Sequence, residues 1–219
     1  MPPLLLASQG GGTRASPAAP MHFFCIFAKT NFPLVIVSKN YCIFACEMNQ
    51  LIRSYIALKR ITHSLGFGIQ SPTDYRFSRT VINESWPYYA YDDFDAEPDW
   101  LKRKLGKLYF RLTNFRQPGT IIDMVGAAPY AKRACPGAEV VKNTDHVDIA
   151  FVPIECEYQQ LLDMCDGHSI VIFEGIHRKL PLWHCIEYDK RTTISFDLYY
   201  CGIVMFDPKR IKHCYTINF

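Results

Sequence analysis

The sequence predicts an α/β protein in which helices precede an open, mostly parallel sheet with an antiparallel edge strand at the C-terminal end. Three observations support this prediction. Apolar residues recur at helical spacing early in residues 48–117, whereas short apolar runs alternate with helical segments in residues 118–219. Residues 169–173 (SIVIF) are almost wholly apolar, as expected of a strand covered on both faces. Residues 192–198 and 203–206 flank a short turn, a pattern typical of a hairpin.

The composition excludes several classes of protein. Hydrophobic residues make up 49% of the 219 positions, which is enough to form a core and argues against disorder throughout the chain. The net charge of +3 is too small to indicate a nucleic-acid or membrane partner. The 9 cysteines include no CxxC pair, so we expect mostly buried, reduced thiols, no metal site and a cytoplasmic protein.

Residues 1–47 differ from the remainder of the chain. Their charged side chains are Arg14, Lys29, Lys39 and Glu47, and their apolar runs are shorter than the roughly 18–20 residues of a membrane span. We favour the interpretation that translation starts at Met48 and that residues 1–47 are an artefact of an early start codon. A weakly ordered native extension and a membrane anchor or export signal are the alternatives.

The helical region, residues 48–117, contains three predicted helices. The first spans residues 49–65 and ends at the glycines of GFG. Ser71 followed by proline predicts the start of a second helix, which ends near residue 83. Asp99 predicts the cap of a third, which runs to about residue 112. This third helix carries four basic residues, Lys102, Arg103, Lys104 and Lys107. They indicate a solvated helix face, and the alternative is a phosphate-binding surface.

The α/β domain, residues 118–219, alternates strands and helices. Strands are expected at residues 120–125, 138–143, 148–152 and 169–173, then at the two arms of the hairpin and at residues 214–219. A short helical segment follows the first strand, and residues 155–165 form another helix. This order describes a Rossmann-like open sheet that ends in an antiparallel pair.

Two stretches of the chain resemble a known family. Residues 174–177 (EGIH), Trp183 and residues 195–204 (SFDLYYCGIV) follow one another as the corresponding elements do at the end of bacterial class I S-adenosylmethionine-dependent methyltransferase-like proteins. Residues 66–72 (GFGIQSP) are similar to an element that precedes the domain in that family, with Gln70 where a histidine is usual. The resemblance implies S-adenosylmethionine as cofactor and methyl transfer to an oxygen or nitrogen of a small-molecule acceptor.

The resemblance also implies where the cofactor binds. Asp123, Gly126 and Ala127 would line its methionine end, and Asp145, 22 residues after Asp123, would bind the ribose. The loop keeps one glycine, and Pro129 removes a backbone donor from it. A plain turn after the strand, with Asp145 as a solvated turn residue, is therefore the alternative.

Glu174 and His177 are the catalytic candidates that the resemblance implies, and both would lie near the methyl acceptor. The family's paired aspartates are reduced here to one carboxylate, so a hydrogen-bonded structural histidine is the alternative for His177. Only 25 residues separate Asp123 from Asp148, which indicates a shortened cofactor half. The alternative function is thus a catalytically inactive binding or scaffold protein of the same fold.

Two substitutions distinguish these roles. Gly202 is expected at a turn or bulge position, so that Gly202→Val would strain the backbone and destabilise the fold without affecting cofactor binding. Asp123→Ala is expected to abolish cofactor binding with little loss of stability.

Overall fold

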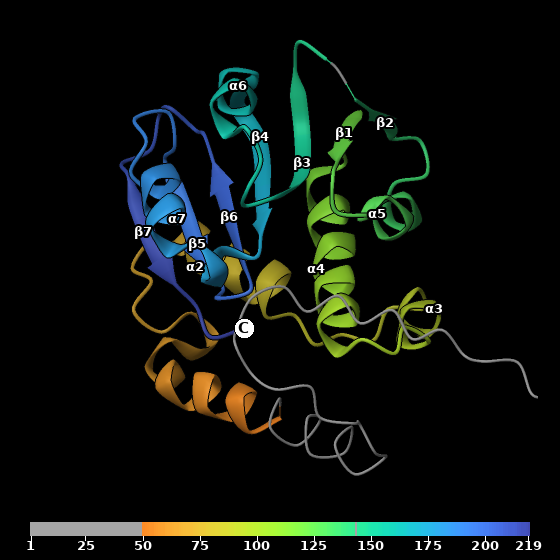
Figure 1. Cartoon of the computed structure of the whole chain (residues 1–219), viewed down its shortest axis with the longest axis vertical. Helices are drawn as coiled ribbons and strands as arrows, with labels where there is room; N and C mark the ends of the chain where they lie inside the picture. Colours follow the sequence, from red (N-terminus) through yellow and green to blue (C-terminus); the bar gives the residue numbers. More distant parts are fainter. Residues whose placement is uncertain (1–49, 143) are drawn as a thin grey trace, which may run out of the picture. The chain divides into compact units, whose positions relative to one another are not determined.

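A seven-stranded sheet organises the chain, with the strand order β2-β1-β3-β4-β6-β5-β7 (Figure 1). The computed structural model describes residues 50–142 and 144–219. The interpretations of residues 1–47 therefore lie outside the described residues. The strands are β1 (Thr120–Asp123), β2 (Glu139–Val141), β3 (Val147–Pro153), β4 (Cys165–Glu174), β5 (Ile194–Asp197), β6 (Cys201–Met205) and β7 (His213–Thr216).

One strand of this sheet is reversed. Strands β1 to β4 pair in parallel, β6 is antiparallel to both β4 and β5, and β7 pairs in parallel with β5. The prediction of an α/β fold with a mostly parallel, Rossmann-like open sheet preceded by helices is confirmed. The antiparallel strand was expected at the edge of the sheet, and it is β6. The reversed strand β6 lies inside the sheet, because β5 and β7 extend the sheet beyond it.

Helices pack on both faces of the sheet and form some of the connections between its strands. Residues 50–59 are helical and continue into a short 3-10 segment, η1 (Ile61–Gly66). The other helical elements are α2 (Pro72–Phe77), η2 (Ser78–Ile82), α3 (Tyr91–Asp95), α4 (Trp100–Arg116), α5 (Ala128–Ala134), α6 (Tyr158–Asp163), η3 (Ile176–Arg178) and α7 (Leu180–Glu187). The two caps that the sequence predicts are present: Ser71 Oγ accepts the Asp74 N–H, and Asp99 Oδ1 accepts the N–H of Leu101.

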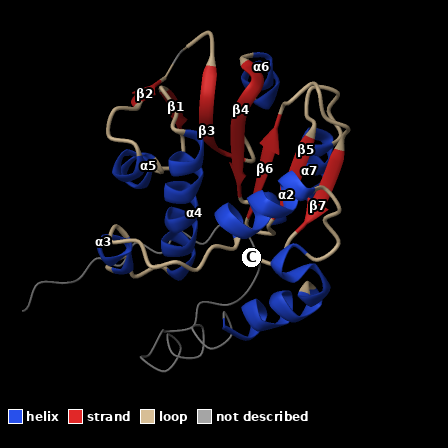
Figure 2. Ribbon diagram, turned by 180° about the vertical axis from the view of Figure 1, so that it is seen from behind, coloured by secondary structure: helices blue, strands red, loops and turns tan. Residues whose placement is uncertain are grey.

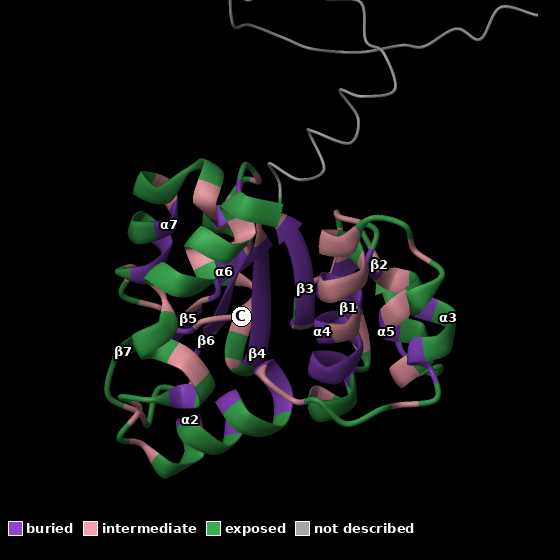
Figure 3. Ribbon diagram, turned by 90° about the horizontal axis from the view of Figure 1, so that it is seen from below, coloured by how far each residue is buried: buried purple, intermediate pink, exposed green. Residues whose placement is uncertain are grey.

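The alternation of side chains along the strands produces two apolar layers. On one face, residues such as Ile149 and Phe196 pack against α2, η2, α4 and α5. On the other face, residues such as Val171 and Phe173 pack against α6 and α7. Figures 1 and 2 show α2 and α7 on opposite sides of the sheet. The central strands β3 and β4 are mostly buried in Figure 3, which agrees with the apolar run that the sequence identified.

The N-terminal helices are joined to the last strands by polar contacts. Arg60 Nη2 lies 2.7 Å from Asp197 Oδ1. Asp74 is 1% exposed, and its carboxylate accepts hydrogen bonds from Arg210 and from the Tyr215 hydroxyl, the latter at 3.0 Å. Segments more than 130 positions apart in the sequence therefore form one structural unit.

Gly202 is required for packing and does not occupy a turn. It lies inside β6, and a Cβ built on it would approach the Trp183 ring to 2.3 Å. The left-handed turn residue is Tyr199, with φ of 72°. The expectation of a turn or bulge at Gly202 is thus wrong, because the constraint is the close approach of the buried Trp183 side chain.

The expectation of mostly buried cysteines holds only in part. Among the described cysteines, Cys201 is fully buried, whereas Cys185 and Cys214 are exposed. Cys185 lies in α7, where Trp183 and Ile186 are buried and Cys185 faces solvent. An apolar run along the sequence therefore does not specify which of its members face the core.

Candidate functional site

The carboxyl ends of the parallel strands meet at one edge of the sheet. Asp123 ends β1, Pro153 ends β3 and Glu174 ends β4; the register aligns Asp123 with Phe151 and Pro153 with Glu174. In open α/β sheets, ligands bind outside the carboxyl ends of the strands. We call this edge the carboxyl edge and examine first the residues that it brings together.

The Asp123 side chain holds the loop after β1. Its Oδ1 accepts the backbone N–H groups of Val125, Gly126 and Ala127 at 2.9–3.0 Å, and its Oδ2 accepts that of Ala128 at 2.7 Å. Four amides at the start of α5 are therefore satisfied inside the loop. The carboxylate organises the loop, and these amides are not free to donate to a ligand.

The remaining loop residues divide between core and solvent. Gly126 has φ of +83°, and a Cβ built on it would meet no atom within 4 Å. Ala127 is fully buried in the core. Pro129 lies in the first turn of α5, where the missing N–H is not needed by the helix. The loop thus presents a glycine to open space, and its proline supports the start of the helix.

Asp145 lies at the other edge of the sheet. It is exposed and follows the short connection from β2 back to the start of β3. The carbonyl of the next residue, His146, accepts a hydrogen bond from the hydroxyl of Thr120, the first residue of β1, at 3.5 Å. Asp123 is the last residue of the same strand. The structure therefore does not bring Asp145 together with Asp123.

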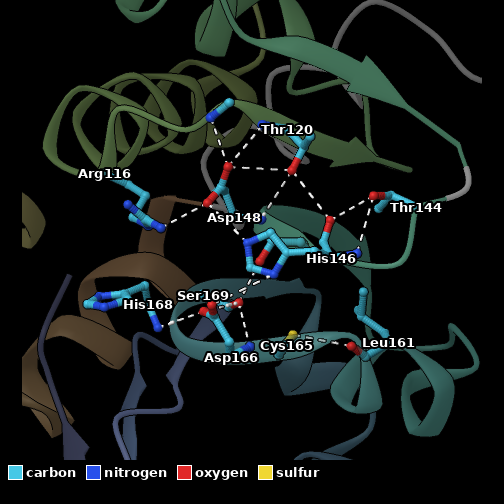
Figure 4. A network of polar contacts seen from close by, with 12 residues as sticks. Arg116, Thr120, Thr144, His146, Asp148, Leu161, Cys165, Asp166, His168 and Ser169 are labelled. Carbon is cyan, nitrogen blue, oxygen red and sulfur yellow. Dashed lines mark hydrogen bonds and ion pairs between the residues drawn. The ribbon is translucent and has the colours of Figure 1, made fainter.

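The edge near Asp145 carries a charged network (Figure 4). Asp148 Oδ2 accepts the N–H groups of Gly119 and Thr120, and its Oδ1 lies 2.8 Å from Arg116 Nη2. Burial acts to raise the pKa of Asp148, but these backbone donors and the arginine outweigh it and lower the pKa. The carboxylate therefore fixes the start of β1 to β3 and the end of α4.

Glu174 is held by a tyrosine that the sequence did not identify. Tyr109, a buried residue of α4, donates its hydroxyl to Glu174 Oε2 at 2.9 Å. Burial, Cys201 and Glu174 raise the pKa of Tyr109 well above its usual range, and Asp123 adds to the effect. Tyr109 thus holds one of the two carboxylates of the carboxyl edge by a hydrogen bond. Because Tyr109 lies among the apolar residues of α4, the sequence did not identify it as a candidate functional residue.

His177 lies against two tyrosines beyond the end of β4. Its ring stacks on Tyr199, with centroids 5.1 Å apart, and meets Tyr200 edge-on at 5.5 Å. Its Nδ1 is buried without a hydrogen-bond partner among the described residues. Burial and the charge of Arg178 lower the pKa of His177, which favours the neutral imidazole. Gly175, with φ of 82°, makes the turn that brings the histidine back towards β6.

The basic residues of α4 do not form a solvated stripe. Lys107 Nζ lies 2.6 Å from Asp95 Oδ1. Lys104 Nζ lies over the rings of Trp100 and Phe219, at 5.1 and 4.3 Å from their centroids. Burial lowers the pKa of Lys104 to about 8. The expectation of a solvated face is wrong for Lys104, because the C-terminal residue folds back over the helix.

Two further classes of site were searched for in the described part of the chain. No group of three or more histidine, cysteine or carboxylate side chains there is arranged to hold a metal ion. No helix in residues 50–142 or 144–219 has the length and apolarity needed to cross a bilayer.

Comparisons with family models, with curated proteins and with solved structures found no match to this chain. The resemblance to methyltransferase-like proteins thus depends on the residues of this chain alone. Of the six predicted site residues, the fold gathers five at the carboxyl edge and leaves Asp145 at the opposite one: Asp123, Gly126 and Ala127 follow β1, and Glu174 and His177 follow β4.

Proposed function

We propose that this chain is an S-adenosylmethionine-dependent methyltransferase-like protein that binds its cofactor at the carboxyl edge. One observation carries the proposal: the Asp123 side chain fixes the loop after β1 so that Gly126 faces open space beside the neighbouring strand β3. A glycine with a positive φ lets the backbone approach a ligand closely. Such a loop at the carboxyl end of the first strand is where open α/β sheets bind adenine-containing cofactors.

The residues fit the cofactor at one end. Gly126 leaves room for the methionine part, and the carboxylate of Asp123 attracts its cationic groups. At the ribose end, the residue that directly follows β2 is Lys142, which is exposed and cannot accept hydrogen bonds from hydroxyls. We therefore assign Asp123 and Gly126 to the methionine end and no described residue to the ribose. Ala127 is not assigned, because its side chain is buried and its N–H is bonded to Asp123.

Glu174 and His177 would serve the methyl acceptor. The cofactor supplies an electrophilic methyl group when bound. Because Tyr109 donates to Glu174, the carboxylate is held in one orientation at the end of β4. The lowered pKa of His177 keeps its imidazole neutral, so it can accept a proton from an oxygen or nitrogen nucleophile. The other contribution of the protein to catalysis would be to position the methyl donor and the methyl acceptor relative to each other.

The two stretches that carry the resemblance lie close together in the fold. The ring centroid of Phe77, five residues after the stretch 66–72, lies 5.2 Å from that of Phe196 in the stretch 195–204. Trp183 of the tail packs against Gly202, so the order of motifs along the chain corresponds to one packed unit.

A catalytically inactive binding or scaffold protein of the same fold is the second candidate. The position of Asp145 at the opposite edge favours it, since no acid is then available for the ribose at the carboxyl end of β2 among the described residues, and Glu139 begins that strand. The four loop amides already bonded to Asp123 favour it too. The two candidates differ in whether the cofactor binds at all and whether it turns over.

Calorimetry of the full chain with S-adenosylmethionine separates them. We expect micromolar binding, and Gly126→Asn should weaken it about tenfold or more because asparagine tolerates the left-handed conformation but fills the open space. Gly68→Asn is the matched control, since Gly68 also has a positive φ of +89° and an open Cβ position. The absence of any heat of binding at millimolar S-adenosylmethionine would favour the catalytically inactive binding or scaffold protein. Methyl transfer that is lost in His177→Ala would establish the activity.

A further inference from the structure

A cavity lies at the opposite edge of the sheet from the proposed cofactor site. It has a volume of about 480 Å³ and lies between α2, η2, the end of α4, the start of β4 and the end of β6. We call it the amino-edge cavity. Small-molecule sites typically have volumes of roughly 300–1,000 Å³, so this cavity is large enough for a ligand of a few rings.

The wall of the amino-edge cavity combines cationic and apolar side chains. Arg76, Arg116 and Arg210 line it, and Phe77 and Phe115 contribute aromatic rings that meet edge to face at 5.2 Å. Pockets with mostly apolar walls and a few placed charges bind amphipathic small molecules. The arginines indicate an anionic group on that molecule.

Arg116 has an unused donor. Its Nη2 binds Asp148, as Figure 4 shows, but its Nε is buried and has no hydrogen-bond partner among the described residues. Buried donors are nearly always satisfied in folded proteins. Arg76 is exposed and forms no ion pair with any described residue, and its guanidinium is therefore available as well.

The acidic residues of the cavity are already engaged. Asp74 accepts hydrogen bonds from Arg210 and from the Tyr215 hydroxyl. Asp207 Oδ1 accepts the backbone N–H of Lys209 at 3.0 Å. Asp74 thus neutralises Arg210, and Asp148 pairs with Arg116. Among the arginines of the cavity wall, Arg76 is the one without a carboxylate partner in the described part of the chain.

We propose that the amino-edge cavity binds a small anionic ligand in which a phosphate or carboxylate is attached to an apolar, ring-sized body. The anionic group accepts hydrogen bonds from the exposed guanidinium of Arg76. The Nε of Arg116 is buried in this structure and reaches the anionic group only after the Arg116 side chain shifts. The apolar body packs on Phe77 and Phe115. This site is separate from the carboxyl edge, and its existence does not depend on the proposed methyltransferase function.

Calorimetry of the full chain with phenyl phosphate tests the ligand class. Benzoate tests a carboxylate in place of the phosphate. Inorganic phosphate carries the anionic group without the apolar ring, and benzyl alcohol carries the ring without the anionic group. We expect phenyl phosphate or benzoate to bind about tenfold more tightly than the two incomplete probes. The proposal is overturned if neither complete probe binds at millimolar concentration, or if benzyl alcohol binds as tightly as both.

Two arginine variants locate the site. Arg76→Gln should weaken the better probe about tenfold, because it removes a charge-assisted hydrogen bond. Arg79→Gln is the matched control: Arg79 is exposed, lies three positions further along the same helical segment and does not line the cavity. Equal affinity of the two variants would refute the proposed location. Gly126→Asn should leave probe binding unchanged whether or not S-adenosylmethionine binds at the other edge.

Discussion

At the scale of single residues, the candidate site is built from side chains that have structural partners. Asp123 bonds four loop amides, Glu174 accepts the Tyr109 hydroxyl, and His177 stacks on Tyr199. A residue implied by a resemblance can therefore support the fold and the proposed function together. The effect of a substitution at such a residue on protein stability must be measured before its effect on binding can be interpreted.

Asp123→Ala is expected to destabilise the protein, which corrects the expectation of little loss. The substitution leaves the amides of residues 125–128 without their common acceptor, at a cost of about 1–3 kcal/mol in the free energy of unfolding. Denaturant unfolding measures this cost. Asp123→Asn should cost less, because its Oδ1 can still accept N–H groups. An unchanged free energy of unfolding in Asp123→Ala would contradict the capping role.

Lys104 should make stability depend on pH. Its pKa is lowered to about 8 in the folded state from 10.5 in the unfolded chain. Between these values the unfolded state binds more protons, so this residue's contribution to stability rises with pH from about 8 upward. Below pH 8 the charged, partly buried ammonium opposes folding.

The Lys104→Met variant isolates this effect. Its advantage in the free energy of unfolding over the wild type should be largest below pH 8 and should shrink towards pH 10. Lys102→Met, at an exposed position of the same helix, serves as the control and should show no such change. A pH-independent difference for Lys104→Met would show that the ammonium is not desolvated.

At the scale of elements, packing between β6 and α7 fixes the reversed strand. Trp183 is fully buried in α7 and covers Gly202, while Ile203 faces the other layer. A strand in the interior of the sheet has both faces covered, so each position has a size limit. At Gly202 that limit excludes even a methyl group.

Gly202→Ala should therefore destabilise the protein by about 1–3 kcal/mol, because the added Cβ overlaps the Trp183 ring and the core must shift. Thermal unfolding with a matched Gly137→Ala variant tests this. Gly137 has an open Cβ position and no positive φ, so its substitution should leave the melting temperature nearly unchanged. Recovery of stability in a Gly202→Ala, Trp183→Leu double variant would confirm the cause. Equal melting temperatures of the two alanine variants would contradict it.

At the scale of the whole molecule, contacts between the helical region and the last strands close the fold. Asp74 is nearly inaccessible to solvent and is bonded to Arg210 and Tyr215, which lie more than 130 positions later in the sequence. Removing one partner of a buried ion pair leaves the other charge uncompensated. These contacts join residues 48–117 to the sheet of residues 118–219.

Asp74→Asn is expected to cost about 3–5 kcal/mol in the free energy of unfolding, since Arg210 then loses its charged partner. Chemical denaturation of the single variant, of Arg210→Met and of the double variant gives the coupling energy. The double variant should be less destabilised than the sum of the single variants. Strict additivity would show that the two side chains do not interact in solution.

The sequence by itself determined the order of the strands along the chain and the type of most elements, whereas the helices α3 and α7 were not predicted from the spacing of residues. Apolar periodicity located the strands β1, β3 and β4, and local side-chain caps at Ser71 and Asp99 located two helix starts, because these signals depend on neighbours within a few positions. The resemblance implied that Asp123 lies near the cofactor and Glu174 near the acceptor, and the structure places both at one edge because parallel strands align their carboxyl ends.

Only the tertiary structure decided which side chains those residues meet. The Tyr109 hydroxyl on Glu174, the indole of Trp183 on Gly202 and the ring of Phe219 over Lys104 all join distant parts of the chain. The short return from β2 to β3 likewise placed Asp145 at the wrong edge for a site with Asp123. Such contacts depend on how layers pack and where connections run, and spacing along the sequence carries no information about either.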